Sequence, residues 1–305
     1  MNEHSRKSVA EVFEDFVISQ SAQDLSPITI ANYRHHFHSI SRHLDIWQPM
    51  EALTKSKLEA MVVSMRKSGL AHNSISSYCR VLRTFLGWCQ REGMTVPPMP
   101  QIKDKETVKE AYTDEELDAV LKRPKKDFSF CEYRNWVIVN FLMNCGCRAS
   151  SVRNIQNRDV DLDTKQIIFR HNKNGKIQTV PLCSVMVSIL REYMAVRRGK
   201  SDDYLFCNQY GAMLSMNALR HAVARHNQSR GVEKTSTHLY RHTFARKYLV
   251  DCGGDAFMLQ KLLGHSTLKM TRHYCAIYDA DIAKNFDRFS PLAQMSQAKE
   301  KIRRT

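Results

Sequence analysis

Apolar residues in the N-terminal third of the chain recur every three or four positions, the spacing that gathers them on one face of an α-helix. Four such segments follow one another with short connections. Pro27 suits the first turn of the second segment, Ser26 can cap it, and Gly69 can stop the third. The sequence therefore predicts a small all-helical domain whose helices cover residues 8–19, 27–44, 54–67 and 73–90.

A proline-rich stretch ends this pattern. Pro97, Pro98 and Pro100 exclude a helix and favour an extended, semi-rigid connector. Thr113 and Glu116 then form a capping box ahead of a new apolar run, which marks the start of a second domain. We therefore expect an N-terminal domain at 1–96, a linker at 97–110, a second domain at 111–290 and a polar, basic tail at 291–305.

The second domain mixes helical patterns with one β-hairpin. Residues 133–144 are strongly apolar and read as its core helix, which Gly146 ends. Two β-branched stretches, 166–171 and 176–182, flank an Asn/Gly-rich turn at 172–175, and this arrangement is typical of a hairpin. Further helical patterns cover 184–197, 215–227, 237–250, 255–263 and 267–277. The fold class expected is mostly α, in two domains.

Composition places the chain among globular proteins. It has 305 residues, of which 43% are hydrophobic and 25% charged, enough for two domains with a core each. No charged-then-apolar leader begins the sequence, and no apolar run approaches the roughly 20 residues of a membrane-spanning helix. We therefore expect no membrane association and a cytoplasmic location. The nine cysteines are scattered and odd in number, which favours reduced core thiols.

Positive charge is concentrated in the second domain. Residues 1–110 carry 14 Lys/Arg against 12 Asp/Glu, whereas residues 111–305 carry 32 against 19, and these make the net charge of +15. A basic domain is the electrostatic footprint expected of a DNA- or RNA-binding protein. In the first domain, a row of side chains that could face either DNA or solvent consists of Arg34, His35, His36, His38 and Arg42.

Candidate catalytic residues gather in one stretch near the end of the chain. His238 and Arg241 lie three residues apart, His265 sits in a Gly-His-Ser turn, and Tyr274 follows. Cleaving a phosphodiester requires an in-line nucleophile, donors for the non-bridging oxygens, and an acid for the leaving oxygen. Arginine suits the second task because its planar fork matches two oxygens. No carboxylate cluster for a metal and no Walker-type phosphate loop is present in the sequence.

Each candidate also has an ordinary structural explanation. Residues 237–250 could be a simple amphipathic helix, and His265 could bond only to backbone in its turn. A lone tyrosine such as Tyr274 is more often a core aromatic, and its hydroxyl, with a pKa near ~10, needs a cationic surround before it attacks at neutral pH. Only the combination of these residues raises Tyr274 above Tyr240, Tyr248 or Tyr278.

Five motifs in order resemble the tyrosine recombinase, or phage integrase, family. They are residues 144–150 around Arg148, Lys173 in the hairpin turn, residues 238–245, residues 262–266, and Tyr274. The resemblance covers the whole second domain, and the N-terminal helices are similar to the family's core-binding domain. It implies an N-terminal four-helix, SAM-like domain and a mainly α catalytic domain with a small β-sheet.

The resemblance also implies roles. Arg148 and Arg241 would bind the scissile phosphate, with His265 adding a donor. His238 would assist proton transfer. Lys173 would protonate the departing 5′ oxygen, and Tyr274 would form a 3′-phosphotyrosyl bond that preserves the ester for religation. No cofactor, metal or ATP is expected.

At two positions the sequence departs from the family pattern or allows more than one assignment. The family usually places a carboxylate three residues after the first arginine, where this chain has Ser151. Lys176 competes with Lys173 for the role of acid, although the turn position favours Lys173. Family members also exchange their C-terminal segment within a tetramer on DNA, and the residues after Tyr274 are long enough to do so.

The expected function is a site-specific DNA recombinase acting on double-stranded DNA with paired inverted core sites. With no further domain before Ser8, we expect a simple recombinase associated with a bacterial nucleoid, most simply the integrase or transposase of a mobile element. A chromosome-dimer resolvase or an inversion enzyme shares the same chemistry. A non-catalytic DNA-binding protein on this fold is a weaker alternative. A zinc module is disfavoured because His238 and His242 lack an HExxH glutamate and no CxxC pair is present.

Overall fold

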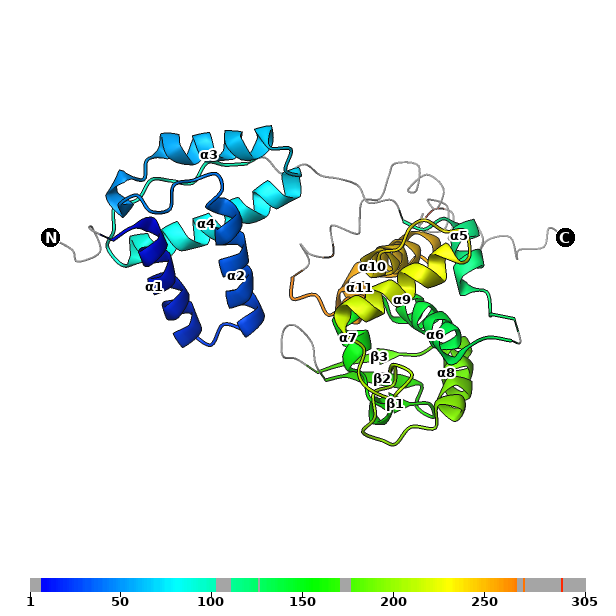
Figure 1. The fold of residues 1–305 in the computed structure, drawn as a ribbon. Helices are drawn as coiled ribbons and strands as arrows, with labels where there is room; N and C mark the ends of the chain where they lie inside the picture. The colour runs from blue at the N-terminus through cyan, green and yellow to red at the C-terminus, as the bar shows by residue number, and fades with distance from the viewer. Residues whose placement is uncertain are drawn as a thin grey trace. The chain divides into compact units, whose positions relative to one another are not determined.

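The computed structural model describes residues 7–102, 111–125, 127–170 and 177–267, together with Thr271 and Leu292. The chain divides into two compact units, Met1–Thr107 and Val108–Thr305 (Figure 1). The exact domain bounds given above remain a prediction. In the described ranges, no helix has both the length and the apolar character needed to cross a bilayer.

The first unit contains the four predicted helices. They are α1 (Val9–Ala22), α2 (Pro27–Ile40), α3 (Lys55–Lys67) and α4 (His72–Arg91). Ser8, Ser26 and Thr54 each accept a backbone hydrogen bond in the first turn of the helix that follows, so the helix starts read from the sequence are confirmed. The rings of Phe13 and Phe37 stack at 3.7 Å, joining α1 to α2 in a buried aromatic core.

The basic row on and just after α2 lies mostly at the surface, which both of its interpretations, facing DNA or facing solvent, require. Arg34 is exposed and pairs with Glu14 at 2.6 Å. His36 is partly buried and its ring lies edge-on to Tyr78, with centroids 5.3 Å apart. Burial and the neighbouring His35 lower the pKa of His36, so its ring favours the neutral form.

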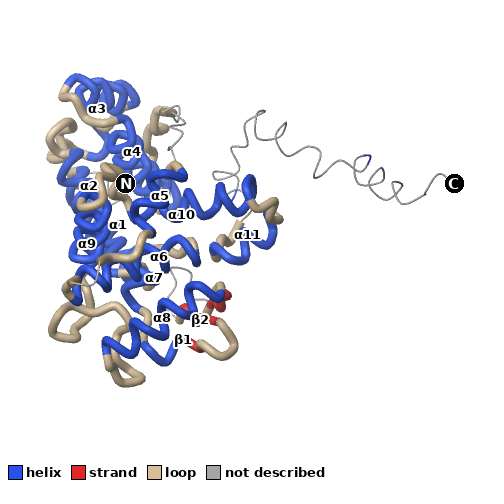
Figure 2. Tube along the Cα trace, turned by 90° about the vertical axis from the view of Figure 1, so that its right-hand side faces the viewer, coloured by secondary structure: helices blue, strands red, loops and turns tan. Residues whose placement is uncertain are grey.

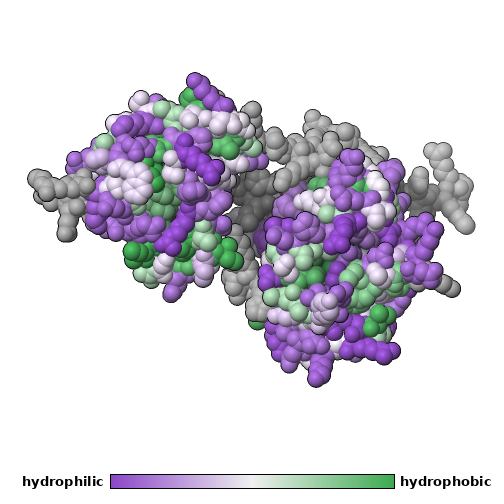
Figure 3. All heavy atoms as spheres, viewed as in Figure 1, coloured by the Kyte–Doolittle hydropathy of each residue, from purple (hydrophilic) through white to green (hydrophobic). Residues whose placement is uncertain are grey.

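The second unit surrounds one buried helix. Its helices are α5 (Asp114–Leu121), α6 (Phe130–Cys145), α7 (Ala149–Asn154), α8 (Ser184–Arg197), α9 (Met216–Gln228), α10 (Thr237–Arg246) and α11 (Ala256–Leu263). Helix α6 packs against α5, α8, α9 and α10, and ten of its residues are buried. The apolar segment at 133–144 is therefore the core helix, as predicted. The face of this unit that Figure 3 shows is mainly hydrophilic, with smaller apolar patches.

A three-stranded antiparallel sheet lies beside α8 (Figures 1 and 2). The strands are β1 (Val160–Asp161), β2 (Gln166–Phe169) and β3 (Gln178–Pro181), in the order β1-β2-β3. Ile167 pairs with Val180 and Ile168 with Thr179, so the predicted hairpin is confirmed, with Pro181 at its end. The predicted turn at 172–175 lies outside the described residues. The fold class, mostly helical with a small sheet, is also confirmed.

Several boundaries differ from the prediction. Helix α6 begins three residues early, because Ser129 and Glu132 form a capping box that the apolar pattern did not reveal. Helix α10 ends at Arg246 and widens into a π-helical turn, Lys247–Asp251, in which the amide of Cys252 donates to the carbonyl of Lys247. Helix α7 and strand β1 were missed, since six and two residues are too short to show a period. The predicted helix at 267–277 lies almost wholly outside the described residues.

Candidate active site

The guanidinium of Arg241 lies between the C-terminal ends of two helices. Its Nη1 donates to the carbonyl of Gly146 at 3.0 Å, and its Nη2 donates to the carbonyl of Leu263 at 2.9 Å. Gly146 caps α6 and Leu263 is the last residue of α11, so both acceptors sit at the negative end of a helix dipole. With 2% of its surface exposed, Arg241 is a buried cation held by main-chain oxygens.

Gly146 permits this arrangement through its backbone and its lack of a side chain. It adopts φ 56°, a left-handed conformation that ends α6. A Cβ at this position would lie 2.3 Å from Cδ1 of Phe244 on α10. Glycine therefore allows α10 to approach the end of α6 closely enough for Arg241 to reach the Gly146 carbonyl.

His265 completes the surroundings of Arg241. Its Nε2 lies 2.6 Å from Nη2 of Arg241, and its Nδ1 lies 2.9 Å from Oγ1 of Thr271. Because a guanidinium can only donate, Nε2 is the acceptor and the ring proton is on Nδ1. Burial, followed by the charges of Arg241, Arg148 and His238, lowers the pKa of His265 to about 4. The imidazole is thus neutral at physiological pH, with both ring nitrogens engaged.

Arg148 and His238 line an adjacent cavity of about 370 Å³. Arg148 is the N-cap residue of α7, directly after the glycine turn, and His238 lies in the first turn of α10. Met216 and Arg220 of α9 contribute another wall. Arg220 was not singled out from the sequence, because nothing in the periodicity of α9 distinguishes it from a solvated arginine.

Four of the six predicted site residues therefore come together: Arg148, His238, Arg241 and His265. Lys173, its competitor Lys176 and the predicted nucleophile Tyr274 lie outside the described residues. Their assigned roles remain proposals.

Strand β3 is tied to the turn that carries His265. Nε2 of Gln178 donates to the carbonyls of Lys261 at 3.0 Å and Leu262 at 2.7 Å, near the end of α11. Gly264 follows in the left-handed region at φ 63°, and a Cβ there would lie 2.6 Å from Oε1 of Gln178. The end of α11 is thus fixed from two sides, by β3 and by Arg241.

A buried carboxylate lies close to Ser151. Asp159, 4% exposed, pairs with Nε of Arg170 at 2.7 Å and accepts from the amide of Gln156 at 2.9 Å. Ser151 and Asp159 line the same small pocket next to β2. Asp159 precedes a two-residue strand with no recognisable pattern, so the sequence offered no signal for it.

In the described ranges, no three His, Cys, Asp or Glu side chains converge on a point where they could hold a metal ion. His238 and His242 lie edge to face, with ring centroids 5.4 Å apart. The zinc alternative therefore gains no support from this part of the chain.

Comparison with known proteins identifies the relatives of this chain. The sequence profile of the phage integrase family matches residues 110–281, and that of the phage integrase N-terminal SAM-like domain matches residues 13–93. Tyrosine recombinase XerA of Thermococcus kodakarensis is 28% identical over 273 residues, covering 88% of this chain and 91% of the relative. Tyrosine recombinase XerC of Alcanivorax borkumensis is 25% identical over 283 residues, covering 90% and 91%.

Solved structures share the fold. The Tn1549 transposon integrase in complex with transposon right end DNA aligns with a TM-score of 0.77 at 17% identity, over 93% of this chain and 99% of that one. A lambda integrase dimer bound to a COC′ core site aligns with a TM-score of 0.72 at 16% identity, over 90% and 78%. Since the phage integrase profile spans more than half of the chain and the SAM-like profile covers its helical first unit, the protein belongs to the phage integrase family of tyrosine recombinases.

Proposed function

We propose that this tyrosine recombinase cuts and rejoins double-stranded DNA at paired inverted core sites through a 3′-phosphotyrosyl bond to Tyr274, with neither metal nor ATP. The observation that carries the proposal is the buried guanidinium of Arg241, bound to two carbonyls and His265 beside the cavity lined by Arg148 and His238. A fixed cation next to a second arginine suits a phosphate, whose oxygens accept charge-assisted hydrogen bonds.

Charge stabilisation falls to the two arginines in this proposal. Attack on a phosphodiester develops negative charge on the non-bridging oxygens, and donors that are already in place stabilise it without reorganisation. Arg148 and Arg241 supply that positive charge. His265, neutral because its pKa is about 4, adds no charge, and its Nε2 accepts a hydrogen bond that holds the Arg241 guanidinium.

Proton transfer falls to the remaining residues. Tyr274 attacks the phosphorus and forms the phosphotyrosyl ester, and Lys173 gives a proton to the 5′ oxygen that leaves. His238, at the cavity wall, assists the transfer of the tyrosine proton. Religation reverses these steps. The phosphotyrosyl ester retains the energy of the broken phosphodiester bond, so no external energy source is required.

The biological role proposed is integration or transposition of a mobile element. The likeness in fold to a transposon integrase agrees with this role. Resolution of chromosome dimers is the second candidate, because the relatives named above are Xer recombinases. Recombination of plasmids that carry either the element ends or a chromosomal core site would separate the two.

We propose that the active form is a tetramer on DNA in which residues after Tyr274 pack on a neighbouring copy. Helix α11 supports this proposal because two of its apolar side chains, Phe257 and Met258, are 68% and 58% exposed and offer a surface on which a segment of another copy can pack. Its buried core with α10 is small, centred on Ala245, Leu259 and Leu263. Deleting residues 279–305 should leave a DNA-binding protein that fails to tetramerise, as measured by mass photometry.

Trapping the covalent intermediate tests the chemistry. The full chain is incubated, in the presence of EDTA, with genomic DNA duplexes that carry nicks. When cleavage occurs close to a nick, the short fragment diffuses away, so religation cannot occur and the covalent adduct accumulates. Adducts that survive denaturation are then collected. Sequencing the attached strand gives the site, the polarity and the spacing of the two cuts.

Tyr274→Phe is the matched variant, because it removes only the hydroxyl. It should bind the same DNA and form no adduct. An undiminished adduct in this variant, or a strict need for divalent ions, would refute the proposed mechanism.

A further inference from the structure

Helix α10 carries two rows of side chains with different tasks. His238 and Arg241, three residues apart, form the row that reaches the site, whereas Tyr240 and Thr243 form a neighbouring row that is 0% exposed. Each member of the second row is tethered by a polar group from elsewhere in the sequence. Oη of Tyr240 donates to Oδ1 of Asn227 at 2.7 Å. Oγ1 of Thr243 accepts from the Tyr112 amide at 3.0 Å.

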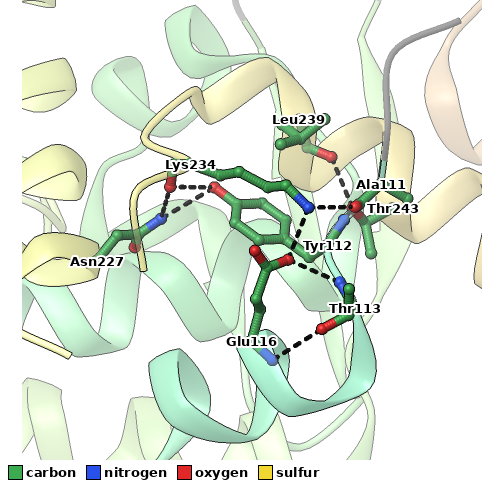
Figure 4. Close-up of polar contacts among 8 residues, drawn as sticks. All are labelled: Ala111, Tyr112, Thr113, Glu116, Asn227, Lys234, Leu239 and Thr243. Carbon is green, nitrogen blue, oxygen red and sulfur yellow. Dashed lines mark hydrogen bonds and ion pairs between the residues drawn. The ribbon is translucent and has the colours of Figure 1, made fainter. Parts of the chain in front are cut away.

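Asn227 and Tyr112 are also joined to each other, as the dashed line between them shows (Figure 4). Nδ2 of Asn227 donates to Oη of Tyr112 at 2.9 Å and to the carbonyl of Lys234 at 2.6 Å. Oη of Tyr112 donates to the same carbonyl at 3.0 Å. The rings of Tyr112 and Tyr240 lie 4.5 Å apart. Both Nδ2 hydrogens and the Oδ1 of Asn227 are thereby engaged, and the four residues form one connected network, to which Thr243 is joined through the Tyr112 amide.

The carbonyl oxygens of Lys234 and of the Asn227 side chain fix the direction of two of these hydrogen bonds, because they can only accept. Removal from water raises the pKa of Tyr112 to about 12 and raises the pKa of Tyr240 further above its ordinary value. Both hydroxyls therefore keep their protons at any working pH, so Tyr240 can donate to Asn227 and Tyr112 can donate to the carbonyl of Lys234. Asn227, which is 0% exposed, has no water to replace a lost partner, so a change in the network must move the helix or leave a polar group unpaired.

The network also sets where α10 begins. Its N-cap residue, Ser236, makes no side-chain hydrogen bond to the first turn. Instead the chain is held two residues earlier, at Lys234, whose carbonyl accepts the bonds described above. Nζ of Lys234 donates to the carbonyl of Ala111 at 3.1 Å and pairs with Glu116 at 2.9 Å (Figure 4). Tertiary contacts thus fix the first turn of α10, where His238 lies.

We propose that Tyr112, Asn227, Tyr240 and Thr243 are positioning residues that set the rotation and axial position of α10, and through it the placement of Arg241 and His238 at the phosphate. The inference rests on the proposed function. None of the four lines the cavity beside Arg148, so they act through the helix and not on the substrate. Misplacing a catalytic group by about 1 Å can slow a reaction by about 100-fold, so a small rotation of α10 is enough to matter.

Tyr240→Phe is the most direct perturbation, because it removes the one buried hydrogen bond from Tyr240 on α10 to Asn227 on α9 and keeps the ring. Tyr193→Phe is its matched control: Oη of Tyr193, also 0% exposed, donates to the carbonyl of Leu205 at 3.0 Å, and Tyr193 lies on α8. Both variants should lose similar stability. Single-turnover formation of the DNA adduct should slow by about 10-fold or more for Tyr240→Phe and change by less than about twofold for Tyr193→Phe.

Thr243 offers a second, independent test. Thr243→Val keeps the shape of the side chain and removes the oxygen that accepts from the Tyr112 amide. Thr243→Ser restores that oxygen. Slow adduct formation in the valine variant, with recovery in the serine variant, is the expected pair of results.

A substrate with a neutral methylphosphonate at the scissile position separates positioning from general damage. Such a linkage carries no charge for Arg241 to neutralise, so the rates of Tyr240→Phe and of Arg241→Ala should approach the wild-type rate on it. A variant that is merely less well folded should be slow on both substrates.

The outcomes are distinguishable. If the wild-type chain forms no adduct on the phosphodiester, the proposed function fails. If Arg241→Ala is relieved by the neutral substrate while Tyr240→Phe behaves like Tyr193→Phe, the recombinase proposal survives and the positioning role is overturned.

Discussion

Replacing Gly146 with alanine is expected to destabilise the second unit by about 3 kcal/mol. An alanine held at φ 56° costs about 1 kcal/mol in backbone strain. Its Cβ would lie 2.3, 2.8 and 2.9 Å from three ring atoms of Phe244, and overpacking of this kind costs about 1–3 kcal/mol. The two effects add because the strain is local to the turn and the clash is with another helix.

Gly211→Ala is the matched control. Gly211 also has a positive φ, 84°, but nothing lies within 4 Å of a Cβ built there, so only the backbone strain applies. The reduction in unfolded-chain entropy is the same for both substitutions and cancels in the comparison. Gly146→Ala should therefore be less stable than Gly211→Ala by about 2 kcal/mol, a Tm difference of about 4–8 °C for a unit of this size.

Chemical denaturation and calorimetry of the two variants measure this difference. Phe244→Ala in the Gly146→Ala background removes the ring that the new Cβ meets, so the two substitutions should be coupled by about 2 kcal/mol in a double-mutant cycle. If Gly146→Ala and Gly211→Ala were equally stable, α10 would not approach the end of α6 as closely as described. The account of how Arg241 reaches the Gly146 carbonyl would then be wrong.

Three further predictions concern buried side chains that can ionise. Arg241→Lys cannot span both carbonyl acceptors, so adduct formation should slow by about 100-fold or more while DNA affinity, measured by fluorescence anisotropy, changes little. Asp159→Asn breaks the half-buried ion pair with Arg170 and should cost roughly 1–2 kcal/mol in urea denaturation, against less than about 0.5 kcal/mol for Asp202→Asn in its exposed pair with Arg158. Burial lowers the pKa of His226 and His265 to about 4 from an ordinary 6.5, so between those values the unfolded chain binds more protons and stability should fall as pH is lowered. Replacing either histidine with glutamine should flatten that pH dependence by about one proton.

Local signals in the sequence were enough to predict most of the fold. Ser8, Ser26 and Thr113 each cap the helix that begins beside them, because capping depends on residues at most three apart. The hairpin was equally local, with β-branched strands on either side of an Asn/Gly-rich turn. The π-helical turn at the end of α10 could not be predicted in this way. The amide of Gly254 donates to the carbonyl of Tyr248 there, and the pattern of apolar and polar residues does not reveal that hydrogen bond.

The sequence pointed to the four candidate site residues that the structure brings together, but not to the groups that hold them in place. Arg241 and His265 were found from motif spacing, whereas the acceptor at Gly146 is 95 residues from Arg241 in sequence. Tyr112 and Thr243 are 131 residues apart, and neither residue type signals a buried hydrogen bond. Which residues become hydrogen-bond partners depends on how the helices pack around α6, so these pairs can be identified only from the folded structure.

Main-chain atoms provide two of the acceptors that hold Arg241, and this has a consequence for how the protein can evolve. A carbonyl oxygen is present whatever side chain a position bears, so substitutions at Leu263 cannot delete it. What selection must preserve is the backbone path at the ends of α6 and α11, where Gly146 and Gly264 take left-handed conformations. Side chains elsewhere in these helix ends can therefore change without removing the acceptors that hold the guanidinium.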